Sequence, residues 1–538
     1  MHRAAPCVLA VCVAVHVPAP APAAPTKGYG ALVQLFAEWR EVQRPPVIEG
    51  VPDYTPEALE QQRRRLSVMR ARLDAIDPAG LSPAERIDRE LVLLEMNGLD
   101  FDLRVLRPWS RNPSFYAMAI SSQSDTPLRE GPTIEGAIEL WRLSLPLPAA
   151  AASLLQQRLR AIPRLLTQAR RNLTQDARDL WLVGIRTHRE QAAVLAAFAE
   201  RLRPHHPDLV PDVERARQAA DAFRDWLEET LPGKRGPSGV GRLNYDWYVR
   251  NVHRLPYTWQ DELVLMQREL ARSLAHLALE EHSNRALPPL EPATTAAEWQ
   301  RRADLAFAFY MRFLRERDVL EVADYLEPAL RARLGSFVPA ERRDFFSEVD
   351  AREPLLLRCH GSHWFDLARM EREPHASPIR RVPLLYNIWD SRAEGLATAM
   401  EELMMSAGLY ADRPRSRELV YIMVAQRAAR AIAGLRMHSN EWTIEEAVRF
   451  ACENTPRGWL RMDGDTVWGE QQLYLEQPGY GTSYLTGKAM IESLMAERAA
   501  ALGPAFTLRR FMDELNAAGM IPVSLIRAEL VESGDERN

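Results

Sequence analysis

WDSRAEGLATAMEELMMSAGLYA, residues 389–411, is the stretch that decides the fold. Its apolar side chains recur at spacings of three and four: Leu396, Met400, Leu403 and Met404. This spacing and the absence of proline predict an amphipathic helix, and Gly408 is typical of a helix C-terminus. Glu394 and Glu401 are separated by two helical turns, so they project from the same face.

These carboxylates have two interpretations. On an ordinary surface helix, Glu394, Glu401 and the neighbouring Glu402 would form a solvated face paired with Arg392 and other arginines. Buried beside a methionine-rich stripe, they would instead need an arginine, a metal ion or water as a partner. Three further motifs in the C-terminal half favour a buried site.

The rest of the chain also has a helical pattern. Of its 538 residues, 46% are hydrophobic and 26% are charged, as in ordinary globular proteins, and no persuasive alternating strand pattern occurs. Helices are expected at 29–42, from Thr55 onward, and after the capping box formed by Ser82 and Glu85. A further helical region, 136–231, is expected to break at Pro146, Pro148, Pro163 and 204–207. We therefore predict an all-α protein.

The chain is predicted to form two lobes. The segment PGKRGPSGVGRL, 232–243, is the clearest linker because it is rich in glycine and proline. It separates an N-terminal helical lobe, 25–235, from a C-terminal helical lobe, 236–538, which carries the site motifs. The polar stretch 109–133 is expected to be a long ordered loop, and such loops are often functional.

The first 24 residues have the pattern of a secretory signal peptide. A short basic start, His2 and Arg3, leads into the apolar run CVLAVCVAVHV and then into small residues spaced as a cleavage site, Ala21 and Ala23. The alternative is a wrongly assigned start codon. No later apolar run reaches the roughly 18 residues of a membrane span, so we expect an exported protein, periplasmic or extracellular, with no integral membrane segment after the signal.

Composition excludes some partners. The net charge is -5 with acidic and basic residues interspersed, so no nucleic-acid surface is indicated. Cys359 and Cys452 remain after the signal peptide, and a disulfide between them is possible but not required by their spacing. The oligomeric state is not indicated.

The first of the three motifs is RCHGSHWFDLARM, 358–370. His360 and His363 are three residues apart, so on one helix they would lie on the same side and could share a metal ion. Asp366 follows three residues later. The alternative is a hydrogen-bonded pair of core histidines.

The second motif is LRMHSNEWTIEE, 435–446. Thr443 and Glu446 form a capping box, which places His438 on the loop before a helix, where it could face a cleft or cap the preceding helix. The third is WGEQQLYLEQPGYGTSYLTGK, 468–488. Pro478 and Gly479 break a helix, and the next helix carries Tyr480, Tyr484 and Lys488 along one stripe.

Several roles are open for this third motif. Gly479 and Gly481 leave amide groups free at a helix N-terminus, which is a natural anion site. A tyrosine hydroxyl can donate to a developing oxyanion. The tyrosines could equally be packing residues whose hydroxyls are satisfied.

Four segments occur in an order that resembles a known family: EGLATAMEE (394–402), MHSNEWTIEEA (437–447), PGYGTSYLTGK (478–488) and AGMIPVSLIRAEL (518–530). The chain resembles bacterial proteins of domain of unknown function 885 (DUF885). That family is similar to helical zinc metallopeptidases of the thimet oligopeptidase and carboxypeptidase Taq type. The resemblance implies a large two-lobed helical fold around a deep cleft. It also implies zinc held by two histidines and Glu394, with Tyr484 steadying the oxyanion.

The chain departs from the family pattern at the catalytic motif. The usual HExxPGH is replaced by LRCHGSH, 357–363, and the usual EGW by Glu394-Gly395-Leu396. If His363 matches the second histidine, Arg358 stands where the glutamate base belongs. If His360 takes the first role, Gly361 replaces that base. Loss of the base typically costs about 10²- to 10⁴-fold in rate, although Asp366 or Glu401 could stand in.

Two functions from different classes remain open. One is an exported metallopeptidase-like protein with weak or lost zinc-peptidase activity, which binds a peptide or small carboxylate in a central cleft near Arg358, Lys488 and the Gly479 turn. The other is an active metal-dependent hydrolase, a peptidase or amidase. The predicted metal ligands, for zinc if a metal is bound, are His360, His363 and Glu394. In the weak or silent protein, Glu394 and Glu401 would instead pair with arginine or lysine. The remaining predicted site residues converge on the same cleft: Glu401, His438, Tyr480, Tyr484 and Lys488.

Overall fold

The computed structural model describes residues 28–532, so the predicted signal peptide, 1–24, lies outside the described residues. The protein is 70% helix and 2% strand, which confirms the all-α prediction. Two short strand pairs are present: β1 (Val47–Ile48) with β2 (Val51–Pro52), antiparallel, and β3 (Ala119–Ile120) with β4 (Ile138–Glu139), parallel.

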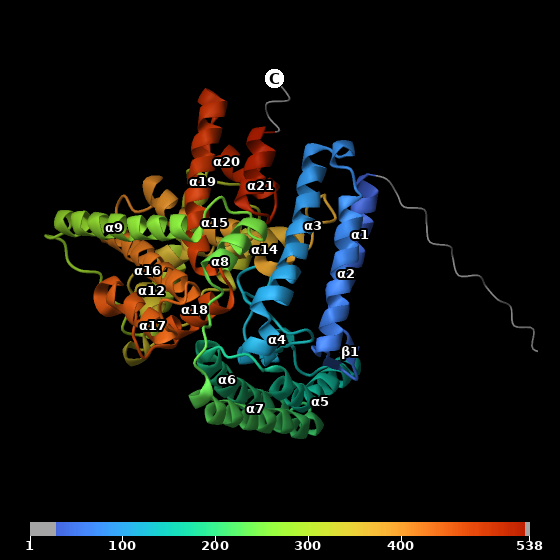
Figure 1. The fold of residues 1–538 in the computed structure, drawn as a ribbon. Helices are drawn as coiled ribbons and strands as arrows, with labels where there is room; N and C mark the ends of the chain where they lie inside the picture. Colours follow the sequence, from blue (N-terminus) through green and yellow to red (C-terminus); the bar gives the residue numbers. More distant parts are fainter. Residues whose placement is uncertain (1–27, 533–538) are drawn as a thin grey trace, which may run out of the picture.

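Three helices near the N-terminus lie side by side (Figure 1): α1 (Tyr29–Val42), α2 (Pro56–Asp74) and α3 (Pro83–Phe101). Thr55 caps α2, and the predicted capping box of Ser82 and Glu85 forms at α3. Three more helices pack beneath them: α5 (Ala149–Asn172), α6 (Arg178–Leu202) and α7 (Val210–Thr230). The expected break at Pro163 is wrong, because α5 continues through this proline with an uninterrupted buried face.

The remaining helices form the part of the protein that holds most of the predicted site. They are α4 (Pro108–Arg111), α8 (Arg242–Asn251), α9 (Trp259–Ser283), α10 (Ala296–Glu316), α11 (Leu326–Arg331), α12 (Phe345–Arg352), α13 (Pro354–His360), α14 (Ser362–Arg372), α15 (Asp390–Ser406), α16 (Pro414–His438), α17 (Ile444–Glu453), α18 (Asp465–Glu476), α19 (Tyr480–Leu502), α20 (Leu508–Ala517) and α21 (Val523–Arg527). The most extensive helix contacts join α9 to α16 and α15 to α19.

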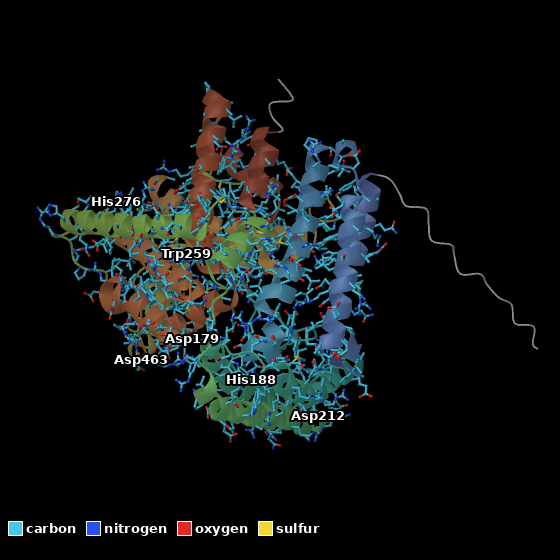
Figure 2. The ribbon with its side chains drawn as sticks, viewed as in Figure 1. Asp179, His188, Asp212, Trp259, His276 and Asp463 are labelled. Carbon is cyan, nitrogen blue, oxygen red and sulfur yellow. The ribbon has the colours of Figure 1, made fainter. Side chains whose placement is uncertain are left out.

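The predicted linker, 232–243, makes hydrogen bonds to both predicted lobes. The amide of Arg178 donates to the carbonyl of Gly236 (3.2 Å), and the amide of Gly241 donates to the carbonyl of His438 (2.8 Å). Asp179, labelled in Figure 2, accepts from the amide of Ile444 (3.0 Å) and so joins the start of α6 to the start of α17. The division at 235/236 and the deep cleft between two lobes remain predictions.

Helix α15 is confirmed as a helix, but it is not amphipathic in its surroundings. Every residue from Asp390 to Glu401 is buried. It packs tightly on α19 because glycines meet at the crossing, where a Cβ on Gly395 would lie 2.6 Å from the Cα of Gly487. The alternative of a solvated face is therefore wrong, and the favoured interpretation of buried glutamates is the one that the structure shows.

Two smaller features are relevant to the predicted export: the state of the cysteines and the hydropathy of the helices. Cys359 and Cys452 are free thiols, and Cys359 is buried with its sulfur 3.7 Å from the hydroxyl of Tyr410. Within residues 28–532, no helix has both the length and the apolar character needed to cross a membrane.

Candidate metal centre

The two histidines of the first motif lie on different helices. His360 is the last residue of α13 and His363 is the second residue of α14, with Gly361 between them. The interpretation of a single helix is therefore wrong, yet the rings still meet, with centroids 5.1 Å apart. The turn is closely packed, because a Cβ on Gly361 would lie 2.5 Å from the Cδ1 of Leu330, which would have to shift.

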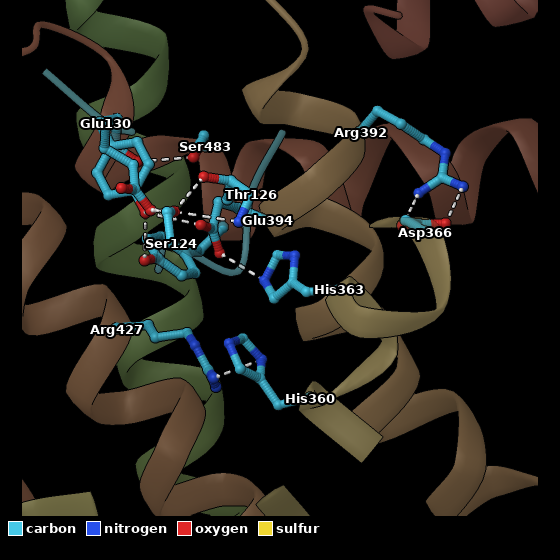
Figure 3. Close-up of polar contacts among 12 residues, drawn as sticks. Ser124, Thr126, Glu130, His360, His363, Asp366, Arg392, Glu394, Arg427 and Ser483 are labelled. Carbon is cyan, nitrogen blue, oxygen red and sulfur yellow. Dashed lines mark hydrogen bonds and ion pairs between the residues drawn. The ribbon is translucent and has the colours of Figure 1, made fainter. Parts of the chain in front are cut away.

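A cluster of three ligand-type side chains forms where α13 and α14 face α15 (Figure 3). The ligand atoms of His360, His363 and Glu394 all lie within 4.8 Å of one another. Glu394 Oε2 is 3.3 Å from His363 Nε2 as an ion pair, without hydrogen-bond geometry. Glu394 Oε1 accepts a hydrogen bond from the hydroxyl of Tyr480 (2.7 Å).

Electrostatics hold this cluster together without a ligand. Burial alone would lower the pKa of His363, but Glu394 and Asp125 outweigh it and raise this pKa to about 9. Burial likewise raises the pKa of Glu394, but His363, His360 and the Tyr480 hydroxyl lower it to about 2. His363 and Glu394 therefore form a buried imidazolium–carboxylate pair in the free protein.

His360 is oriented by a second buried ion pair. Arg427 binds both carboxylate oxygens of Glu401, at 2.7 and 2.8 Å. The Nδ1 of His360 lies 3.2 Å from Arg427 and 3.2 Å from Glu401 Oε1. With Nδ1 engaged in this way, Nε2 is the ring nitrogen left for a ligand.

The loop between β3 and β4 brings in a carboxylate that the sequence analysis did not name. Glu130 Oε1 lies 3.4 Å from the hydroxyl of Tyr480 and accepts from Ser124 (3.0 Å). Burial raises the pKa of Glu130, and the nearby charges of Asp125 and Glu394 add to this. The available signal was the length of the polar stretch 109–133, which was expected to be functional.

Tyr484 and an acidic cavity complete the site. The Tyr484 hydroxyl donates to that of Tyr480 (3.2 Å). Beyond Glu130 lies a cavity of about 510 Å³, also lined by Asp125 and by Trp364, the residue after His363. The same cavity is lined by further carboxylates and two arginines: Glu190, Asp465, Glu476, Arg129 and Arg186. Glu130, which contacts Tyr480, thus borders space that a substrate could fill, although the three ligand-type residues do not line this cavity.

Two predicted residues lie apart from the cluster. His438 is the last residue of α16, its Nε2 bonds to the carbonyl of Tyr474 (2.7 Å), and burial lowers its pKa to about 4. Lys488 forms ion pairs with Glu402 (2.9 Å) and Glu492 (2.7 Å). Within residues 28–532, no hydrogen bond or ion pair joins either side chain to the three ligand-type residues.

A single family model matches residues 48–302 and 363–530, which is most of the chain. The chain belongs to DUF885, a family of bacterial proteins of unknown function. The matched DUF885 segments include His363, Glu394 and both tyrosines. They leave out 303–362, where His360 lies.

Solved structures show the same fold. A protein of unknown function from Shewanella oneidensis has 14% sequence identity and a TM-score of 0.69, with 94% of this chain and 100% of that chain covered. One from Colwellia psychrerythraea has 15% identity and a TM-score of 0.67, with 95% and 100% covered. Both are named as a "putative lipoprotein". No curated protein matches the chain.

Residues predicted to replace the missing base are already engaged in this DUF885 chain. Arg392 binds both oxygens of Asp366, at 3.1 and 3.2 Å (Figure 3). Glu401 is held by Arg427 as described. Arg358 does not point into the cluster but binds Asp350 (2.8 Å) and the carbonyl of Pro354 (3.1 Å). Arg358 and Lys488 were expected to attract a carboxylate ligand. Both are instead paired with carboxylates of the protein itself.

The donor set fits a zinc ion. Two imidazoles and one carboxylate from separate helices are a common catalytic zinc set, which leaves a position for water. Glu394 Oε2 is buried without a hydrogen bond and has only the ion pair with His363 Nε2, so zinc in place of the His363 proton would satisfy both atoms. The outer contacts are also present, because Tyr480 fixes Glu394 and the Glu401–Arg427 pair fixes His360.

Proposed function

We propose that this DUF885 protein is an exported, metal-dependent hydrolase of low activity, with zinc at His360, His363 and Glu394. The observation that supports it most is the convergence of three ligand atoms within 4.8 Å from α13, α14 and α15. The predicted signal peptide and the names of the two similar structures support a location in the cell envelope.

The side chains around the cluster have separable roles. A bound zinc ion would supply Lewis acidity and lower the pKa of a water molecule. Tyr480 orients Glu394 by donating to its Oε1. The Tyr484 hydroxyl, which donates to Tyr480 in the free protein, would donate instead to oxygen on a bound substrate. Glu130 is the remaining carboxylate close to Tyr480, and its Oε1 would accept the proton of the attacking water.

We expect low activity because the usual base is absent and Glu130 would have to replace it. Leu357, Arg358 and Gly361 replace the motif residues that normally carry the first histidine and the base, and Arg358 is turned toward Asp350. Glu130 comes from a loop rather than from the ligand helix, so its position depends on the bracing by Ser124. The acidic cavity favours a substrate without a negative charge near the cluster, such as a peptide or small amide.

The experiment is metal analysis of the purified protein and its variants. We expect about one zinc per chain, lost in Glu394→Gln and His363→Asn. Glu402→Gln should retain it, because this neighbouring carboxylate pairs with Arg272 and Lys488 instead. Circular dichroism checks that each variant is folded. A folded wild-type protein that takes up no zinc, cobalt or manganese would refute the proposal.

A second function, a metal-binding relative without catalysis, is favoured by the engagement of Asp366 and Glu401 in ion pairs. Peptide-library assays distinguish the two. Hydrolysis that falls about 10²- to 10⁴-fold in Glu130→Gln, with zinc retained, supports the hydrolase. Zinc binding with no hydrolysis in the wild-type protein supports the silent relative.

A further inference from the structure

A second cavity, of about 330 Å³, lies on the other side of the β3–β4 loop. It is bounded by the end of α3, by α8 and by the segment before α15, and none of the three metal-site residues lines it. Its walls are aromatic: Tyr54, Trp109, Phe115, Tyr248 and Tyr386. Asp102, directly after α3, contributes a carboxylate to the same cavity.

The carboxylate of Asp102 has no partner. Among residues 28–532, no side chain or amide donates a hydrogen bond to it, and burial alone raises its pKa to about 7. Arginines near this end of α3 are engaged elsewhere, as Arg104 is with Asp100 (2.7 Å). Arg129 also lines the cavity, but its charge acts on Glu476 and Glu190. Asp102 is half-buried, so its carboxylate faces the cavity without a cation or a donor from the described residues beside it.

Two phenol groups in the same cavity are equally unengaged. The described residues offer no hydrogen-bond partner to the hydroxyls of Tyr248 and Tyr386, and both phenols lie within electrostatic range of Asp102. Burial, with the charge of Asp102, raises both phenol pKa values well above the usual range, so the hydroxyls stay neutral. One carboxylate and two neutral oxygens thus surround a common space.

The backbone around the cavity is unusual at two places. Asp102 begins a π-helical turn, Asp102–Leu106, a feature that is frequent at functional sites. Tyr386 and Asn387 are consecutive non-glycine residues with φ of 57° and 49°. Such left-handed residues persist where the surroundings enforce them, and they cluster at binding sites. Here the strain places the ring of Tyr386 against Gly98, where any Cβ would lie 2.6 Å from the Tyr386 Cβ.

We propose that this cavity binds a primary ammonium group, with Asp102 as its counter-ion and the hydroxyls of Tyr248 and Tyr386 as further acceptors. An ammonium group has three donors, which matches the three acceptors. The aromatic walls favour a cation and an apolar body behind it. The ligand class is an organic amine or the amino terminus of a peptide.

This binding site is independent of the metal centre but lies close to it. Asn387 lines the cavity and donates to Gln477 (2.9 Å), and Gln477 in turn donates to Asp390. Asp390 is one helical turn before Glu394 on α15. Because none of the three metal-site residues lines the cavity, amine binding can be tested without any assay of hydrolysis.

The test is calorimetric titration with phenethylamine and with the dipeptide amide Phe-Gly-NH₂, using N-acetylphenethylamine as the neutral analogue. We expect at least one amine to bind with a Kd of about 1 mM or tighter, and the acetylated analogue to bind at least about 30-fold more weakly. Tighter binding of the dipeptide would identify a peptide terminus, and equal binding would identify a free amine.

Two variants separate the ion pair from general packing. Asp102→Asn should weaken amine binding at least about 30-fold while leaving thermal stability equal or higher, since the half-buried carboxylate that is removed has no partner in the described protein. Asp100→Asn is the matched control, because this carboxylate on α3 pairs with Arg104 and should not affect binding. The proposal is refuted if neither amine binds the wild-type protein, if Asp102→Asn binds equally well, or if the acetylated analogue matches the amines.

Discussion

Replacing Arg427 by Met should strongly destabilise the protein. Its side chain is 1% exposed and that of Glu401 is 0% exposed, and two hydrogen bonds of 2.7 and 2.8 Å join them. Burial alone would raise the pKa of Glu401, but Arg427 and His360 lower it, so the carboxylate is charged. Without Arg427 this charge remains buried beside His360 alone, and the free energy of unfolding should fall by about 3–5 kcal/mol.

The double variant Arg427→Met/Glu401→Leu separates the ion pair from the space it fills. Replacing a buried pair by apolar residues of similar volume is often neutral or stabilising by about 1–4 kcal/mol. We therefore expect the double variant to unfold at a urea concentration close to that of the wild-type protein. Urea titration followed by circular dichroism provides the comparison. A single variant that loses less than about 1 kcal/mol would refute the reasoning, since Glu401 would then be hydrated or protonated.

The same double variant tests the metal centre. Loss of the contacts at His360 Nδ1 removes the group that orients this ligand, and such losses typically weaken metal affinity about 10- to 100-fold. Zinc titration of the folded double variant measures this effect. An affinity equal to that of the wild-type protein would show that the backbone, rather than Glu401 and Arg427, positions His360.

Two further predictions concern packing and pH. Gly487→Ala should lower the free energy of unfolding by about 1–3 kcal/mol, because its Cβ would lie 2.7 Å from the Cα of Gly395. Gly469→Ala, whose Cβ meets nothing within 4 Å, is the matched control, and equal urea midpoints would contradict the close crossing. Burial lowers the pKa of His188 (Figure 2) and His253 from 6.5 to about 4, so the unfolded chain binds more protons between these values. The contribution of these two histidines to stability should be full above pH 6.5 and fall as the pH drops toward 4, by about 3 kcal/mol for each histidine. Urea titrations of the wild-type protein and His188→Gln between pH 4 and 6.5 would contradict this if their pH slopes were the same.

Local chemistry made the helix ends predictable from sequence. The capping boxes at Ser82 and Thr443 depend on residues three apart, and the break at Pro478 and Gly479 depends on two adjacent residues. Pro163 misled the prediction because the buried face of α5 continues on both sides of it. Tertiary packing there outweighs the loss of one backbone hydrogen bond.

The site was only partly predictable because its polar partners come from distant segments. Spacing grouped Tyr480, Tyr484 and Lys488 on one stripe, but Glu402 on α15 binds Lys488 and leaves the tyrosines to face Glu394. Nothing local to Glu130 indicates that its loop folds over α19. Burial on all sides of α15 was also hidden, because a periodic pattern describes one face and not what covers the other.

Two residues that the sequence resemblance marks as departures from a metallopeptidase motif, Leu396 and Arg358, have different surroundings. Leu396 lies two residues after Glu394, about 200° around the helix, and it is buried in the core. It therefore contributes to packing, while Tyr480 holds the Glu394 carboxylate. Arg358, the predicted replacement for the base, binds Asp350 instead of facing the cluster. The turn at Gly361 follows His360 at the end of α13, where this histidine lies close to His363 and Glu394. The three ligand-type side chains therefore come together without Arg358, so the proposed metal site and the proposed loss of a base rest on different residues.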